Sequence, residues 1–173
     1  MCGFTGYWSS KGRADVGLGN AMAGQIAHRG PDGEGVWAEE EAGLVLAHRR
    51  LAIIDLSEAG YQPMHSHSGR YVIAYNGEIY NFRELRQALQ ASGKAPQWRG
   101  HSDTEVLLAA VDAWGVEGTL AQLNGMFAFA LWDRQERMLV LARDRMGEKP
   151  LYYGWAGRDF VFGSELKAIR AHP

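Results

Sequence analysis

Short segments with the composition of β-strands, separated by glycine-rich turns, run along most of this chain. The 173 residues include 22 glycines, which indicates many tight turns. Helical segments are gathered in pairs and do not alternate regularly with strands, so the order predicts an α+β fold with antiparallel sheets. The strands are expected at residues 3–8, 35–38, 44–47, 51–54, 70–76, 125–132, 138–142, 151–155 and 160–162.

Polar residues mark the expected helix starts. A helical face covers residues 16–28, and two later helices begin with the pattern of a capping box. In that pattern a polar cap is followed three positions later by Glu or Gln, as in Asn81 with Glu84 and in Ser102 with Glu105. The second box predicts that Asp103 occupies the first position of its helix.

Weaker local signals give further expectations. Ser164 is expected to cap a short last helix that runs toward Pro173. Gly77 is expected to break the strand that begins at residue 70, with residues 78–81 extended beyond the break.

Length and charge limit the class of protein. A chain of 173 residues suits one domain, and a formal net charge of −2 does not indicate a nucleic-acid or membrane partner. No apolar run reaches the roughly 18 residues of a membrane-spanning helix, and the first residues lack the basic-then-apolar order of a signal peptide. The single cysteine excludes an internal disulfide and fits a reducing compartment, so a cytoplasmic protein is expected.

The single cysteine stands at position 2. If Met1 is removed, Cys2 carries both a thiol and a free α-amine, so a nucleophile and a base share one residue. The α-amine has a reference pKa near 8, which suits a proton shuttle around neutral pH. A cysteine at this position is, however, more often an accident, and the remaining motifs are needed to decide.

Four further motifs follow Cys2 in order along the chain. They are Ala47-His48-Arg49-Arg50-Leu51, Tyr75-Asn76-Gly77-Glu78-Ile79-Tyr80-Asn81, Ser102-Asp103-Thr104-Glu105 and Arg143-Asp144-Arg145-Met146-Gly147. With Cys2 they resemble the glutaminase domain of class II glutamine amidotransferases, and within them the glutamine-hydrolysing asparagine synthetases. The resemblance covers nearly the whole chain.

The resemblance implies a fold and a reaction. The fold is that of the N-terminal-nucleophile (Ntn) hydrolases, a four-layer αββα sandwich with two antiparallel sheets. In the reaction, Cys2 attacks the side-chain amide of glutamine, releases ammonia and then releases glutamate through a thioester.

Asn76 and Gly77 are the candidates for stabilising the oxyanion. An Asn amide and a Gly backbone N–H can point together at a developing negative oxygen. Asn-Gly is also the commonest two-residue hairpin turn, and from the residues alone the turn is favoured. The resemblance assigns the matching pair to the oxyanion hole.

A site that selects glutamine needs a cation for its carboxylate and an anion for its ammonium. Arg50 and Asp103 supply these charges, and the resemblance gives the matching residues these roles. The alternatives are a surface salt bridge for Arg50 and a helix-dipole partner for Asp103, and spacing alone does not exclude Arg49. The resemblance adds pocket-lining roles for Leu51, Ile53, Ile54 and Glu78.

Other polar residues have plainer interpretations. His28, His48 and His101 have no obvious catalytic claim, and His65 with His67 lacks the further ligands of a metal site. No metal or cofactor is therefore expected in this domain. Residues 29–32 resemble a family loop near the site, and residues 143–145 and 149–153 are assigned to the fold and to domain contact.

The chain contains no Ser-Gly-Gly-type loop for ATP pyrophosphate. A single glutaminase domain is therefore expected over residues 1–173, as part of a longer protein whose C-terminal synthetase domain uses ATP and Mg²⁺. That parent protein is compatible with a homodimer, and its ammonia acceptor is open. The alternatives are an amidotransferase with another acceptor, or a non-catalytic glutamine-binding or regulatory module, which retention of Met1 would produce.

Overall fold

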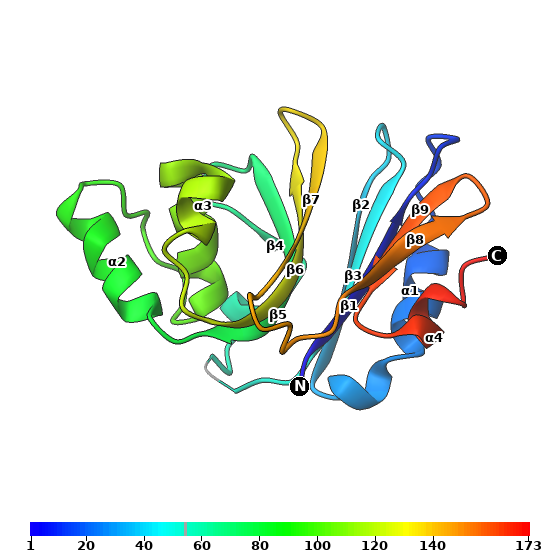
Figure 1. Cartoon of the computed structure of the whole chain (residues 1–173), viewed down its shortest axis with the longest axis horizontal. Helices are drawn as coiled ribbons and strands as arrows, with labels where there is room; N and C mark the ends of the chain where they lie inside the picture. Colours follow the sequence, from blue (N-terminus) through cyan, green and yellow to red (C-terminus); the bar gives the residue numbers. More distant parts are fainter. Residues whose placement is uncertain (54) are drawn as a thin grey trace.

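Two antiparallel sheets form the centre of the molecule (Figure 1). The computed structural model describes residues 1–53 and 55–173. One sheet has the strand order β2-β3-β1-β9-β8 and the other has the order β4-β5-β6-β7. The strands are β1 (Gly3–Trp8), β2 (Gly33–Glu39), β3 (Leu44–Arg50), β4 (Met64–His65), β5 (Tyr71–Ile79), β6 (Gly125–Asp133), β7 (Met138–Arg143), β8 (Tyr152–Ala156) and β9 (Asp159–Gly163).

Helices cover the outer face of each sheet (Figure 1). The helices α2 (Phe82–Ala91) and α3 (Asp103–Leu120) lie outside the sheet that contains β5. The helices α1 (Val16–Gly24) and α4 (Leu166–Ile169) lie outside the sheet that contains β1. This layering confirms the predicted αββα sandwich.

Strand alternation divides the apolar side chains among three cores. Successive side chains of β5 point to opposite faces of its sheet, so Val72 and Ala74 pack between the sheets while Ile73 packs under α3. The core between the sheets also contains Phe4 and Trp132. The core under α1 is smaller and includes Tyr7, Met22, Val45 and Val161.

The pairing of β1 with β3 brings Cys2 beside Arg50. The two strands are antiparallel and Gly3 lies opposite Arg49, so the start of β1 meets the end of β3. Cys2 therefore stands at the edge of a central strand pair, next to the segment that follows Arg50.

The structure corrects the predicted strand at 51–54. The strand β3 ends at Arg50, and neither Leu51, Ala52 nor Ile53 belongs to a strand; Ile54 lies outside the described residues. Leu51 uses its backbone N–H and C=O on the sulfur of Cys2 instead of on a neighbouring strand. Ile53 is 71% exposed, so the apolar run does not become a buried strand.

The predicted break at Gly77 is also wrong. The strand β5 runs without interruption from Tyr71 to Ile79, and Gly77 lies opposite Phe127. A Cβ at Gly77 would overlap the backbone of β6, coming 2.7 Å from the Cα atom of Phe127. Glycine is required here for close packing inside a sheet. Because both residues lie within β5, the interpretation of Asn76-Gly77 as a hairpin turn is wrong.

The expected helix starts have mixed outcomes. Ser102 caps α3 as predicted, since its hydroxyl accepts from the N–H of Glu105. Asn81 precedes α2, but its side chain bonds Gln122 and Asn124 and forms no cap.

The two remaining helix predictions are corrected. The hydroxyl of Ser164 accepts from the N–H of Phe4, so it fastens β1 and does not cap α4, which begins after Glu165. The expected helix at 16–28 ends at Gly24, and a 3₁₀ turn follows over Ala27–Arg29.

Candidate active site

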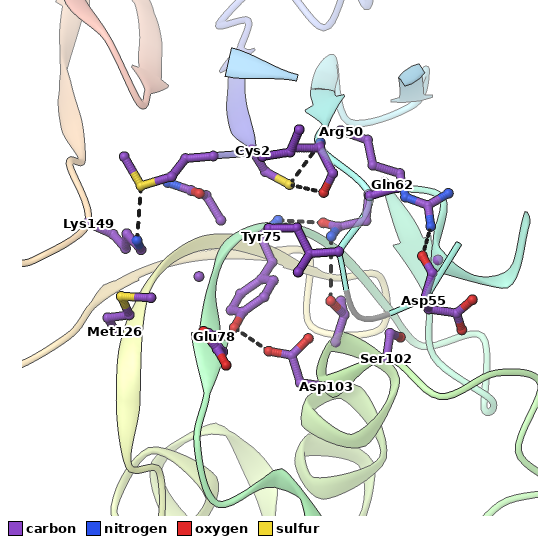
Figure 2. Close-up of a pocket in the computed structure, with 18 residues that line it drawn as sticks. Cys2, Arg50, Asp55, Gln62, Tyr75, Glu78, Ser102, Asp103, Met126 and Lys149 are labelled. Atoms are coloured by element: carbon purple, nitrogen blue, oxygen red, sulfur yellow. Dashed lines mark hydrogen bonds between the residues drawn. The ribbon is translucent and has the colours of Figure 1, made fainter. Parts of the chain in front are cut away.

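A pocket of about 120 Å³ opens where β1 and β3 meet the edge of β5 (Figure 2). The described residues that line it are Met1, Cys2, Arg50, Leu51, Ala52, Ile53, Asp55, Gly60, Gln62, Tyr75, Asn76, Gly77, Glu78, Ser102, Asp103, Thr104, Met126 and Lys149. All candidate site residues within the described ranges are thus brought together. Ile54, a further candidate, lies outside the described residues.

Cys2 is held from both sides. Its sulfur accepts from the Leu51 N–H at 3.3 Å, and its thiol donates to the Leu51 carbonyl at 3.5 Å. Its own carbonyl accepts from Nε of Arg29 at 2.9 Å, and Arg29 is in turn ion-paired with Glu165 at 3.0 Å. The thiol therefore has a defined position at the pocket wall.

Asn76 lines the pocket and carries a buried side-chain donor without a partner among the described residues. It lies on the face of β5 shared with Val72 and Ala74, which is turned toward the other sheet. Asn76 is only 2% exposed, and its Nδ2 atom has no hydrogen-bond partner among the described residues. A buried amide N–H without an acceptor is rare in folded proteins, so this atom is a candidate to receive a ligand oxygen.

The backbone N–H of Gly77 also points toward the pocket. Its partner Phe127 uses both its N–H and its C=O on Asp144, at 3.2 and 2.8 Å, on the far side of β6. In an antiparallel pair, Gly77 must then direct its own N–H and C=O away from β6. The N–H groups of Tyr75 and Ile79 point the same way and bond to Gln62 and Asp103, both of which line the pocket.

Arg50 is oriented by the loop that follows β3. Its guanidinium donates to the carbonyl of Ser57 at 3.0 Å and to the carbonyl of Asp55, and it lies 4.9 Å from the ring centre of Tyr61. The Asp55 carboxylate accepts from the His101 N–H and from Ser57, and these bonds lower the pKa of Asp55. These contacts hold the Arg50 guanidinium at the pocket wall.

Arg49 points elsewhere. Its guanidinium pairs with the carboxylate of Glu34 on β2 and donates to the carbonyl of Gly30 at 3.3 Å. Adjacent strand residues face opposite sides of a sheet, so only Arg50 of the two arginines borders the pocket.

Asp103 is the buried anion of the pocket. It begins α3, and its Oδ2 accepts from the hydroxyl of Tyr75 at 2.7 Å and from the N–H of Ile79 at 2.9 Å. Burial raises the pKa of Asp103, and it also raises the pKa of Tyr75 well above its usual range, with the charge of Asp103 adding to that rise. Tyr75 therefore stays protonated and donates to the carboxylate.

Several pocket residues were missed by the sequence analysis. Lys149 was assigned to the fold, yet it is buried at the pocket and its ammonium lies 3.1 Å from the sulfur of Met1 (Figure 2). Gln62 lies in an irregular segment, and no periodicity or motif marks it. Only the folding of distant segments onto one site reveals these residues.

The histidines lie away from the pocket lining described here. His48 is fully buried and donates to the carbonyl of Tyr75 at 2.9 Å, and burial lowers its pKa to about 4. His28 is exposed and paired with Glu165, and His101 is exposed before α3. Among residues 1–53 and 55–173, no cluster of three or more His, Cys, Asp or Glu side chains is placed to hold a metal ion.

Within the described ranges, every helix is too short or too polar to span a bilayer.

Comparison with known proteins gives consistent matches. The family model described as "Glutamine amidotransferase domain" matches residues 1–173. Asparagine synthetase [glutamine-hydrolyzing] 3 of Bacillus subtilis is 44% identical over 177 residues, which is 100% of this chain and 28% of that protein. Asparagine synthetase B [glutamine-hydrolyzing] of Escherichia coli is 42% identical over 145 residues, which is 83% of this chain and 25% of that protein.

A solved structure supports the fold. The glutamine phosphoribosylpyrophosphate amidotransferase of B. subtilis superposes with a TM-score of 0.81 at 24% identity, over 98% of this chain and 43% of that chain. At this identity the likeness concerns the fold alone. The chain spans between a quarter and a third of the length of the two synthetases it matches. From the match over its whole length, this chain belongs to the glutamine amidotransferase domain family.

Proposed function

We propose that this domain is the glutaminase part of a glutamine-dependent asparagine synthetase, with Cys2 as its nucleophile. The observation that carries the proposal is that Cys2 lines one pocket with Asn76 and Gly77, whose Nδ2 and backbone N–H lack protein acceptors among the described residues. A thiol and two such donors in one pocket suit attack on an amide carbonyl.

The two charged residues of the pocket fit the amino-acid end of glutamine. Arg50 has five N–H donors, of which two are used on loop carbonyls, so others remain for a carboxylate. Asp103 accepts from Tyr75 and Ile79 through Oδ2, and its other oxygen is the proposed partner of an ammonium group. Glu78, Leu51 and Ile53 complete the lining.

The proposed reaction follows from these positions. The sulfur of Cys2 bonds to the side-chain carbonyl carbon of glutamine, and the carbonyl oxygen becomes an oxyanion that accepts from Asn76 and Gly77. The thiol proton passes to the α-amine of Cys2 and then to the departing nitrogen, which leaves as ammonia. Water attacks the resulting thioester, releases glutamate and restores the thiol.

This scheme requires removal of Met1. With Met1 attached, the nitrogen of Cys2 is a peptide amide and accepts no proton. Met1 also lines the pocket, where its sulfur contacts the ammonium of Lys149. The processed chain, beginning at Cys2, is the proposed active form.

The parent protein is proposed to carry a C-terminal synthetase domain, where ATP and Mg²⁺ would act and ammonia would reach aspartate. Support comes from the two matched synthetases, of which this chain covers 28% and 25%. The absence of a Ser-Gly-Gly-type loop in this sequence agrees with that division.

A second candidate is a non-catalytic glutamine-binding module. The observation in its favour is the position of Met1 beside the thiol. One experiment separates the two: glutamate release from glutamine is measured on protein whose first residue is identified by mass spectrometry. Protein that begins at Cys2 is expected to release glutamate. Binding without release by that species would contradict the enzyme and leave the binding module.

A further inference from the structure

The strand next to β5 ends before it reaches the pocket. β4 consists of Met64–His65 and pairs with β5 only at Ile73 and Val72. The order of the sheet places no other strand on that side of β5 within the described residues. The backbone groups of β5 that point away from β6, from Tyr75 onward, therefore need partners other than a strand.

Side chains from three separate parts of the chain supply partners for three of those groups. His48, on β3 of the opposite sheet, donates from Nε2 to the carbonyl of Tyr75 at 2.9 Å. Gln62 accepts the N–H of Tyr75 at 2.7 Å, and Asp103 accepts the N–H of Ile79 at 2.9 Å. The Gly77 N–H lies between these two filled positions and is left facing the pocket.

His48 is suited to a fixed role. It is 0% exposed, and burial keeps it neutral, with its pKa lowered to about 4. Because a carbonyl accepts from Nε2, the single ring proton is on that nitrogen, and Nδ1 has no partner among the described residues. Among residues 1–53 and 55–173, the His48 side chain bonds only to the Tyr75 carbonyl.

That bond holds the peptide group that leads into Asn76. The Tyr75 carbonyl and the Asn76 N–H belong to one planar group. Asn76 lies opposite Ala128, one residue from the Gly77–Phe127 pair, so its N–H points toward β6. His48 fixes the carbonyl side of the plane, and β6 fixes the other side.

We propose that His48 and Gln62 are positioning residues for the oxyanion hole. They bond the β5 backbone where β4 no longer pairs with it, and so hold Asn76 and Gly77 in the orientation that the reaction needs. The inference rests on the proposed glutaminase function. Neither side chain is required to touch the reacting atoms. Their effect passes through the backbone of Tyr75, so it should appear in the transition state more than in substrate binding.

The test compares variants that remove or keep the hydrogen bond. His48→Leu removes the donor, while His48→Gln keeps an N–H near the position of Nε2. Gln62→Met removes the acceptor, while Gln62→Glu keeps it. Thr5→Val is the matched control, because Thr5 is fully buried and donates to a strand carbonyl, that of Phe162, at 2.9 Å, away from the pocket lining.

The measurements are kcat and KM for glutamine hydrolysis, together with Tm. A small displacement of oxyanion donors is expected to lower kcat by roughly 10- to 100-fold in His48→Leu and Gln62→Met. KM should change by less than about threefold, because the glutamine-binding charges are untouched. His48→Gln and Gln62→Glu should recover most of kcat. Thr5→Val should lower Tm without lowering kcat.

A second readout follows the transition state directly. The aldehyde analogue of glutamine, in which the side-chain amide is replaced, forms a tetrahedral adduct with the thiol and so needs the oxyanion hole. Its affinity should fall in His48→Leu by about the same factor as kcat, while glutamine binding is retained.

The outcomes separate the two proposals. If the natural protein hydrolyses glutamine and folded His48→Leu and Gln62→Met keep kcat within about twofold, the positioning role is wrong and the glutaminase function stands. If His48→Leu does not fold, the kcat values of Gln62→Met, His48→Gln and Gln62→Glu test the positioning role. A natural protein that begins at Cys2 and shows no hydrolysis would remove both proposals.

Discussion

The polar groups at the two ends of the pocket differ in whether the protein itself supplies their hydrogen-bond partners. At the proposed reaction end, formed by Cys2, Asn76 and Gly77, two N–H donors lack protein acceptors among the described residues. At the proposed binding end, formed by Arg50 and Asp103, each charged group is already bonded to the protein. The first end holds unmet donors, and the second holds charges that are already oriented.

This difference suits two proposed roles, stabilisation of the transition state and binding of the ground-state substrate. Unpaired buried donors destabilise the empty site, but they are matched when an oxyanion forms, so they favour the transition state. Charges that are held by loop carbonyls and by Tyr75 lose little freedom when a substrate arrives, so they favour binding of the ground state. Variants at the reaction end should therefore change kcat, and variants at the binding end should change KM.

Cys2→Ala should have the largest effect. Without the sulfur no thioester forms, so glutamine hydrolysis is abolished, while Arg50 and Asp103 still bind glutamine. Calorimetry with glutamine and an assay of glutamate release check both halves of the prediction. Hydrolysis by the variant at the natural rate would remove Cys2 from the mechanism.

Retention of Met1 should be nearly as severe. Protein made while removal of the initiator methionine is inhibited lacks the α-amine base and keeps Met1 in the pocket. The processed protein should show activity that rises with pH through about 7 to 8, the range in which an ordinary α-amine loses its proton. Equal rates in the two preparations, with first residues verified by mass, would exclude the α-amine as base.

Asn76→Ala should lower kcat by roughly 100- to 1,000-fold, the usual effect of losing one oxyanion donor. KM should be nearly unchanged. Because the variant also removes a buried amide that lacks a partner, its Tm should be close to that of the natural protein or above it. Steady-state kinetics and a melting curve test this opposition, and a loss of kcat that follows a large loss of Tm would indicate a structural role instead.

At the binding end, Arg50→Ala should raise KM by roughly 30- to 1,000-fold, or about 2–4 kcal/mol, because the substrate carboxylate is left unpaired. Arg49→Ala is the matched control, since Arg49 pairs with Glu34 and lies outside the pocket lining, so the variant should change KM by less than about threefold. If the Arg49 variant proves to be the defective one, the carboxylate clamp has been assigned to the wrong arginine.

Strong local patterns were sufficient for much of the fold. The strand at 3–8 agrees with β1, and the strands predicted at 125–132 and 138–142 agree with β6 and β7, which pair as antiparallel neighbours. The Ser102 cap also formed, and its hydroxyl accepts from the N–H of Glu105 at 3.2 Å at a buried helix start. In these segments the local preference and the tertiary environment agree.

The errors arise where a tertiary contact overrides a local preference. Asn81 fits a cap, but its amide is used to tie the start of α2 to the loop before β6. Gly77 reads as a strand breaker, yet it is needed inside the strand because the backbone of β6 approaches closely. Neither contact leaves a signal in the neighbouring residues.

The residues of the candidate site likewise differ in whether a local pattern in the sequence marks them. Cys2, Arg50 and Asp103 stand in recognisable motifs, so their positions along the chain were predictable from the sequence. Gln62 and Lys149 reach the pocket only through folding, the first from an irregular loop and the second from the turn before β8. Motifs identify residues that touch a ligand more readily than residues that hold those residues in place.

The smallest expected effect concerns the pH dependence at the binding end. Burial raises the pKa of Asp103, so the folded protein binds this proton more tightly than the unfolded chain does. The charged carboxylate therefore lowers stability at neutral pH, and this loss is relieved as pH falls through the raised pKa. An ammonium group bound by Asp103 favours the charged form and opposes that proton. Glutamine should thus raise the Tm of the Cys2→Ala variant more at neutral pH than at acidic pH, and the added change Asp103→Asn should weaken the Tm increase and flatten its pH dependence. An equal, pH-independent increase in both proteins would show that Asp103 does not bind the ammonium, and the binding end would then consist of Arg50 alone.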